Sequence, residues 1–576
     1  MTSAIHAATA AGAARPGLKK TTLLLPIATF YALFLVLPYA YILWLSVTRY
    51  NSTLLFEPVF TLENYASVLT DGYYLALLGK TIALGIFVTA ATLLMGYPLA
   101  MKIAAARPTM KSVLLILVLT PLLVNVVVRT YAWLVLLGDN GVINRSLIGM
   151  GLISDPLPIN RNFISVALGL IHLSLPLMVL SLVSIMEKLD RTLIEAGESL
   201  GAGALRVLVK LHFPLCLQGV GTGCLLVFCT VISAFVTPQL LGGNQFSTIS
   251  CLLHGDQRFR HAPAARRQPV LDDQHRDLSE IHLFDELAGR RHAGVRPADA
   301  QLRRHTPPRL SLQGAVMFDR LLTLLAWAVI FFLVAPLFVI VAASFTTTTY
   351  VTFPPQGLTL KWYRELAMQT EFLRSFVDSV IIGVATMAGA ALVGIPTAFG
   401  LRLGSHRSRA VLRTFVMSPL TLPGIVTGVA LLQLYYAANL DAPLMGIIVG
   451  HILVTVPFFV RTLGAGLEAV DPAILEAAES LGASRARVLW RILFPSVLPS
   501  ICAGLAFVFI TSFDEVTMSI FFSTPAVMPL PIRIFSYIEF SIDPIIAALS
   551  TILILFAFFV VMTLQKLLGL DSAFRK

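Results

Sequence analysis

The feature that most constrains this chain is a series of apolar segments, most of them about 20 residues long or longer. No water is present inside a bilayer to bond the backbone, so each segment must satisfy its own N–H and C=O groups as an α-helix. The sequence therefore predicts an all-α polytopic membrane protein. The predicted crossings are residues 21–47, 81–101, 113–137, 163–186, 220–241, 321–344, 380–401, 414–436, 444–460, 498–522 and 545–564.

Composition agrees with lipid as the main solvent, because 57% of residues are hydrophobic, 13% are charged and mean hydropathy is +0.82. The net charge of +11 is spread over short Lys and Arg clusters between the apolar runs. This is the positive-inside pattern, so no nucleic-acid partner is expected. The five cysteines show no CxxC or ligand-type spacing, and we expect neither disulfides nor a metal or other cofactor.

The same clusters orient the chain, because Lys and Arg in short loops favour the cytoplasmic side. They place both termini in the cytoplasm, together with the loops near residues 102–111, 188–210, 402–409 and 485–491. Both termini can lie on one side only if the number of crossings is even. Eleven is odd, so one crossing is missing from the series.

An internal repeat locates the missing crossing. Sliding the chain by 298 residues aligns Gly-Tyr-Pro at 96–98 with Gly-Ile-Pro at 394–396. Sliding it by 281 aligns 190–214 with 471–495, where 13 of 25 residues are identical. Two homologous halves in parallel orientation follow. The last crossing then requires a counterpart at 264–283, which reads AARRQPVLDDQHRDLSEIHL and cannot cross a bilayer.

The segment 255–316 is foreign in composition, with no Lys, eleven Arg and eight acidic residues. It is either a solvated linker or a stretch translated out of frame, in which case Met317 marks the original start of a second chain. We prefer the second interpretation, because a linker would leave the second half inverted in the membrane. The predicted organisation is a cytoplasmic tail (1–20), a first half of five helices (21–254), the anomalous polar linker (255–316) and a second half of six helices (317–576).

One motif recurs after the fourth crossing of each half, in cytoplasmic loops at 187–218 and 468–498. It reads Glu-Ala-Gly-Glu-Ser-Leu-Gly at 195–201 and Glu-Ala-Ala-Glu-Ser-Leu-Gly at 476–482. A Phe-Pro pair follows at the same distance and ends at Pro214 and Pro495. Good helix formers, then Gly and Pro, predict a short helix, a turn and a second helix that ends near the Pro. Such a rigid knob suits a groove on a cytoplasmic partner.

The motif resembles the EAA loop of ABC importer permeases, and the resemblance spans nearly the whole chain outside 255–316. It implies two fused permease halves in a bacterial inner membrane, with no ATPase activity of their own. It also implies a cytoplasmic ATP-binding subunit, acting as a dimer, and a periplasmic or lipid-anchored solute-binding protein as partners. Gly197 stands where the second half has Ala478, which should loosen the first helix slightly. The implied ATPase-coupling residues are Glu195, Ala196, Gly201, Pro214, Glu476, Ala477, Gly482 and Pro495.

Two further stretches resemble spermidine/putrescine-type importers, Arg-Thr-Tyr-Ala-Trp at 129–133 and Ser-Phe-Asp-Glu-Val at 512–516. Members of that group also move ferric iron, thiamine or phosphonates, so the solute stays open, with a polyamine-like cation favoured. An ionised acid inside a crossing needs a partner or water. Either the acids line the substrate path, or one of them forms a structural ion pair with Arg129, or Glu515 near the outer end reaches the headgroups. The path candidates are Asp514, Glu515, Arg129, Tyr131 and Trp133.

Other function classes fit less well. Gly79-Lys80-Thr81 is similar to the end of a phosphate-binding loop, but position 74 is Tyr where that motif needs Gly. No enzyme is therefore predicted. A secondary transporter would also contain repeats, but these commonly have inverted topology and need no duplicated docking loop. That class is the alternative to an ATP-driven importer.

Overall fold

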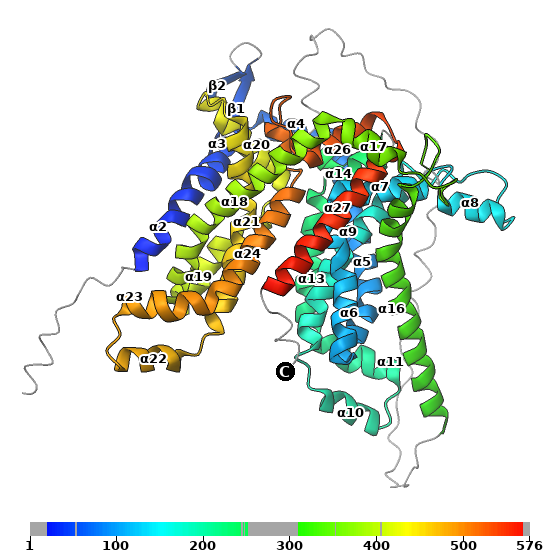
Figure 1. Cartoon of the computed structure of the whole chain (residues 1–576), viewed down its shortest axis with the longest axis horizontal. Coiled ribbons are helices and arrows are strands. Elements are labelled where there is room, and N and C mark those ends of the chain that lie inside the picture. The colour runs from blue at the N-terminus through cyan, green and yellow to red at the C-terminus, as the bar shows by residue number, and fades with distance from the viewer. Residues whose placement is uncertain are drawn as a thin grey trace, which may run out of the picture.

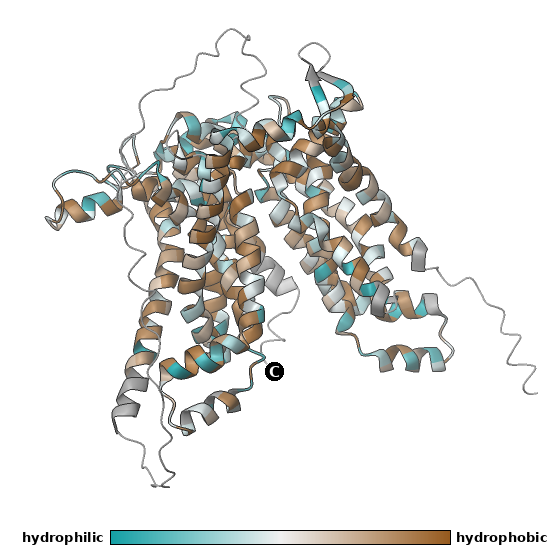
Figure 2. Cartoon of the chain, turned by 180° about the vertical axis from the view of Figure 1, so that it is seen from behind, coloured by the Kyte–Doolittle hydropathy of each residue, from teal (hydrophilic) through white to brown (hydrophobic). Residues whose placement is uncertain are grey.

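The computed structural model describes residues 20–51, 55–243, 246, 248–251, 309–351, 353–403 and 406–567. These residues form two helical bundles that stand side by side (Figure 1). Within these described ranges, eight helices are long and apolar enough to cross a membrane, and the number is ten if each of two bent helix pairs counts as one span. Figure 2 shows apolar residues along the long helices and polar residues gathered toward both ends. The predicted all-α polytopic fold is confirmed.

The first half contains a two-stranded antiparallel hairpin besides its helices. The elements η1 and η3 are turns of π-helix and η2 is a 3₁₀-helix. In chain order the elements are α2 (Lys20–Tyr31), η1 (Ala32–Val36), α3 (Leu37–Ser46), β1 (Thr48–Asn51), β2 (Leu55–Phe60), α4 (Glu63–Thr70), α5 (Gly72–Ala105), α6 (Pro108–Leu119), η2 (Thr120–Leu123), α7 (Val126–Leu137), α8 (Val142–Gly149), α9 (Phe163–Met186), α10 (Arg191–Ser199), α11 (Ala204–Val207), η3 (Leu208–His212), α12 (Phe213–Leu215), α13 (Leu217–Ser233) and α14 (Val236–Gly242).

The described second half follows a similar order without the hairpin and α8, and it continues through α26 and α27; η5 is its 3₁₀-helix and η6 its turn of π-helix. Its elements are α16 (Arg309–Ala343), α17 (Lys361–Met368), α18 (Thr370–Leu403), α19 (His406–Met417), η5 (Ser418–Thr421), α20 (Gly424–Ala437), α21 (Pro443–Glu468), α22 (Pro472–Ser480), α23 (Arg485–Val488), η6 (Leu489–Leu493), α24 (Phe494–Asp514), α25 (Ser519–Phe522), α26 (Leu530–Phe540) and α27 (Pro544–Leu567).

Some predicted crossings break or end earlier than the apolar pattern indicated. The predicted crossing at 113–137 is interrupted at Val124, whose backbone is extended, and Asn125 then caps α7 by accepting the Val127 N–H at 2.8 Å. The crossing at 414–436 bends by 90° between η5 and α20. The helices predicted at 220–241 and 498–522 end at Ser233 and Asp514. Residues beyond these points stay apolar because protein covers them, and hydropathy does not distinguish that cover from lipid.

The repeat holds at the level of single elements. An offset of 298 carries η2 onto η5, and an offset of 281 carries η3 onto η6. Aligned hydrogen bonds agree with it. The Ile249 N–H donates to Thr81 Oγ1 at 3.1 Å, and the Leu530 N–H donates to Ser379 Oγ at 2.8 Å. The structural register of the two halves therefore extends to the last described residues of the first.

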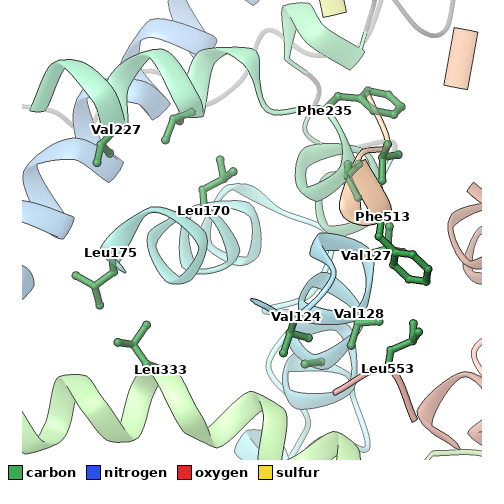
Figure 3. Packing of buried hydrophobic residues seen from close by; sticks show 14 of the residues in the cluster. Val124, Val127, Val128, Leu170, Leu175, Val227, Phe235, Leu333, Phe513 and Leu553 are labelled. Carbon is green, nitrogen blue, oxygen red and sulfur yellow. The ribbon is translucent and has the colours of Figure 1, made fainter. Parts of the chain in front are cut away.

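The first helix of each half packs against the helices of the other half. α2 packs on α18, and the Tyr31 hydroxyl donates to the Val416 carbonyl at 2.9 Å. In the same way α16 packs on α5 and α7, and Lys102 pairs with Asp319 at 2.5 Å. Apolar side chains of both halves consequently share one core, in which Leu333 of α16 and Leu553 of α27 lie in the same cluster as first-half residues (Figure 3).

The anomalous segment falls largely outside the described residues, which resume at Arg309 with the start of α16, eight positions before the predicted boundary at 317. Its two flanks are described. Ser250 donates to the Ile232 carbonyl near the end of α13, whereas the start of α16 lies against α11, close to where the span that contains α13 begins. The chain therefore leaves one end of the bundle and returns at the other. The proposed domain boundaries stay predictions.

Candidate functional site

Each predicted coupling loop begins with a short helix outside the membrane spans. Figure 1 shows α10 and α22 at the same end of the molecule, opposite the β-hairpin. The side chain of Asp190 accepts the Thr192 N–H at 2.9 Å, and that of Asp471 accepts the Ala473 N–H at 2.9 Å. These bonds satisfy N–H groups at each helix start. The Thr192 N–H also lowers the pKa of Asp190.

A left-handed glycine ends both helices. The φ angles of Gly201 and Gly482 are +81° and +83°, a conformation that other residues rarely adopt. The Gly482 N–H bonds to the Glu479 carbonyl at 3.0 Å in a Schellman turn. A Cβ added at either glycine would meet no atom within 4 Å. Glycine is therefore required by the backbone conformation and not by lack of space.

The difference between Gly197 and Ala478 has a packing explanation. A Cβ at Gly197 would lie 2.7 Å from Leu211 Cδ1. The second half has Ile492 at the position of Leu211, and Ala478 is buried there. Glycine at position 197 therefore leaves room for the Leu211 side chain, which an alanine methyl group would crowd. The slight loosening of the first helix by this glycine stays a prediction from the sequence.

A pair of aligned leucines was missed by the sequence reasoning. Leu200 and Leu481 occupy the residue before each turn glycine, and both are 89% exposed. Large apolar side chains in water at equivalent points of two loops are typical of contacts with a partner. Glu195 and Ala196 are exposed nearby on α10. The available signal was a leucine repeated in an otherwise small and polar stretch.

The two prolines differ in outcome: α12 ends at Leu215, one residue after Pro214, as predicted, whereas Pro495 lies in a helical run that continues to Asp514. Each follows one turn of π-helix, and η6 runs directly into α24. A proline in a helix lacks an N–H and crowds the carbonyl four residues earlier, which belongs to Lys210 or Arg491, both in the π turns. The wider turn accommodates the proline. Each predicted coupling loop and the membrane helix that follows it are thereby joined, with a 71° bend in the first half.

The structure brings Arg129 and Asp514 together across the interface between the halves. Arg129 Nη2 lies 3.9 Å from Asp514 Oδ2, and Asp514 Oδ1 accepts the Val126 N–H at 2.8 Å. Asp514 therefore lies at the N-terminus of α7, where the helix dipole also favours a negative charge. Arg129 is buried, and its Nε and Nη1 atoms find no hydrogen-bond partner among the described residues.

The other three path candidates, Tyr131, Trp133 and Glu515, make contacts away from the Arg129–Asp514 pair. The Tyr131 hydroxyl donates to the Asp543 carbonyl at 2.9 Å, and the Trp133 ring packs against Phe332 with centroids 5.2 Å apart. Glu515 Oε1 accepts the Met518 N–H at 3.0 Å and so orders the turn before α25. Tyr131 and Trp133 thus serve the packing of α7 against the second half.

A narrow pocket lies beside the charge pair. Asn125 and Asp514 are polar residues in its lining, and the rest is apolar, including Phe513 and Phe556. Figure 3 shows Phe513 close to the α7 side chain Val127. The equivalent position in the other half holds Ser233, so the carboxylate has no symmetric counterpart. One acidic group and the Asn125 amide therefore line a mostly apolar space between the halves.

Comparison with known proteins assigns the family. The sequence pattern of the family described as "Binding-protein-dependent transport system inner membrane component" matches twice, at residues 93–252 and 390–570. This chain belongs to that family. It is a permease component of a binding-protein-dependent ABC transporter, a multi-pass protein of the bacterial inner membrane and not an enzyme. The first match ends at residue 252, whereas the second continues through α26 and α27.

Similar permeases include three spermidine/putrescine transport system proteins. PotB of Haemophilus influenzae is 36% identical over 211 residues, which is 36% of this chain and 73% of the relative. PotB of Escherichia coli is 33% identical over 221 residues, 38% of this chain and 80% of the relative. PotC of Escherichia coli is 29% identical over 238 residues, 41% of this chain and 90% of the relative. The predicted resemblance to this type of permease is confirmed.

Proposed function

We propose that this permease forms both halves of the pathway of an ATP-driven importer for a small polyamine-like cation, and that α10 and α22 couple it to a separate ATPase. The observation that carries the proposal is the duplicated helix and turn, with an 89% exposed leucine before each left-handed glycine. Both knobs lie at one end of the molecule (Figure 1). Two equivalent knobs suit an ATPase that acts as a dimer.

The link from knob to membrane supports this role. In the second half α23, η6 and α24 form one uninterrupted helical run from the loop to Asp514. A displacement at α22 would therefore be transmitted along α24 to the interface that holds the charge pair. In the first half the corresponding run is bent by 71° at Cys216. We expect the second loop to move its membrane helix more directly.

The substrate class is supported by the relatives' names and by the interface carboxylate. An opposite fixed charge favours a cation in a space of low dielectric. The positive charge of Arg129 disfavours a bound cation. Asp514 is nevertheless the more accessible member of the charge pair, since its side chain is 29% exposed and that of Arg129 is 5% exposed. A diamine that approaches from the pocket would meet the carboxylate first. A periplasmic or lipid-anchored solute-binding protein would deliver it at the end opposite α10 and α22.

The decisive test is transport in proteoliposomes that contain the full chain, a partner ATPase subunit and a solute-binding protein. We expect uptake of radiolabelled putrescine that requires ATP and the binding protein. Uptake that persists without ATPase would instead indicate a secondary transporter. ATP-dependent transport of ferric iron or thiamine, but not putrescine, would leave the importer class standing and refute the cation assignment.

A further inference from the structure

We propose that α3, α4 and η5 form an uncovered docking face for an apolar membrane-spanning helix of the α27 type, and that this helix is encoded between Cys251 and Arg309 in another reading frame. The proposal does not depend on the solute or on ATPase coupling. It follows from comparing the two halves position by position.

The second half shows how the face is filled. α27 packs against α16, α17 and the η2 turn of the first half. On α17, Trp362 and Leu366 are 5% and 8% exposed. Through the repeat, the surface that corresponds to α16, α17 and η2 consists of α3, α4 and η5. The same cover would therefore be expected there.

The corresponding face of the first half is bare in the described structure. α4 has no buried residue. Val68, which aligns with Leu366, is 47% exposed, and the next residue, Leu69, is 63% exposed. The difference between aligned positions in one chain is the signature of a missing neighbour.

The first helix shows the same contrast. Ile340 and Ala343 of α16 are both fully buried. The aligned residues of α3, Ile42 and Leu45, are partly exposed, and Trp44 beside them is 48% exposed. α3 lies within a membrane span. A water-soluble partner could not reach this depth, so this face meets either lipid or an apolar helix, and the repeat with the α27 side of the molecule favours the helix.

The path of the chain identifies where the helix belongs. Residues 249–251 begin a helix in register with the start of α26. The chain is then at the end of the bundle where α13 ends, and α16 starts beside α11 at the other end. One crossing is needed between these points. Residues 264–283, as translated, are too polar to supply it.

The test adds the helix back. Residues 252–286 are replaced by a second copy of residues 533–567, in a chain whose five native cysteines are changed to alanine. Single cysteines are placed at Val68 and Leu366, with Leu152 as the control because it is 67% exposed away from this face. A maleimide applied to the detergent-solubilised protein then reports how accessible each cysteine is, whichever side of the membrane its half would face.

In the chain without the added helix, we expect the Val68→Cys side chain to react about sixfold faster than Leu366→Cys, in proportion to their exposed fractions of 47% and 8%. The added helix should reduce the Val68→Cys rate to that of Leu366→Cys and leave Leu152→Cys unchanged. Equal rates at the two sites before the helix is added would overturn the proposal, because the face would already be covered. An unchanged Val68→Cys rate in membrane-inserted chimera would overturn it as well.

Discussion

Replacing Leu200 and Leu481 with alanine tests the coupling knobs most directly. Both side chains are 89% exposed, so almost their whole apolar surface is available for burial against a partner. Each Leu→Ala change removes three carbons, which is about 2 kcal/mol at ~0.8 kcal/mol per buried CH₂. Together the changes should weaken ATPase binding by about 4 kcal/mol, or about a thousandfold in Kd. The turn glycines are untouched, so the helices should form as before.

The assay is binding of the ATPase subunit to the detergent-solubilised permease, followed by substrate-stimulated ATP hydrolysis in proteoliposomes. The matched control is Leu358→Ala with Leu360→Ala, since these leucines are 80% and 67% exposed on a loop that is not part of the knobs. Wild-type affinity in the Leu200/Leu481 variant would refute the reasoning. An equal loss of ATPase affinity in the control variant would indicate that the permease is destabilised in general.

Three further outcomes are expected. Valine at Gly201 and Gly482 should abolish stimulated ATP hydrolysis while protein levels in the membrane persist, and asparagine, which tolerates positive φ, should retain more activity; normal stimulation in the valine variant would contradict this. Asp514→Asn should raise the putrescine concentration for half-maximal uptake, with Glu515→Gln as the control; unchanged affinity would make Asp514 purely structural. The coding DNA for 252–308, read in another frame, should contain an apolar run of about 20 residues, and a polar sequence in both other frames would contradict the frame interpretation.

Much of this architecture was predictable because it is repeated. Thirteen identities in 25 positions fix the alignment of the coupling loops, and the loop side follows from Lys and Arg. The break at Asn125 was not predictable, because the residues that follow are as apolar as a lipid-facing helix and only their neighbours are protein. Whether Arg129 would meet Asp514 was left open, since sequence spacing carries no information on contacts 385 residues apart. Tyr131 and Trp133 resemble path residues in type but are held in packing contacts.

The packing of each half's first helix on the other half also determines the order in which these contacts can form during synthesis. α2 leaves the ribosome early, but its packing partner α18 begins at Thr370, about 340 residues later. At ~5–20 residues per second, the delay is on the order of 20 to 70 s. During that interval the face of α2 that will contact α18 lies against lipid. If both helices belong to one chain, the late partner is inserted beside the early one; if Met317 starts a second chain, the same contacts must form between two separately made subunits.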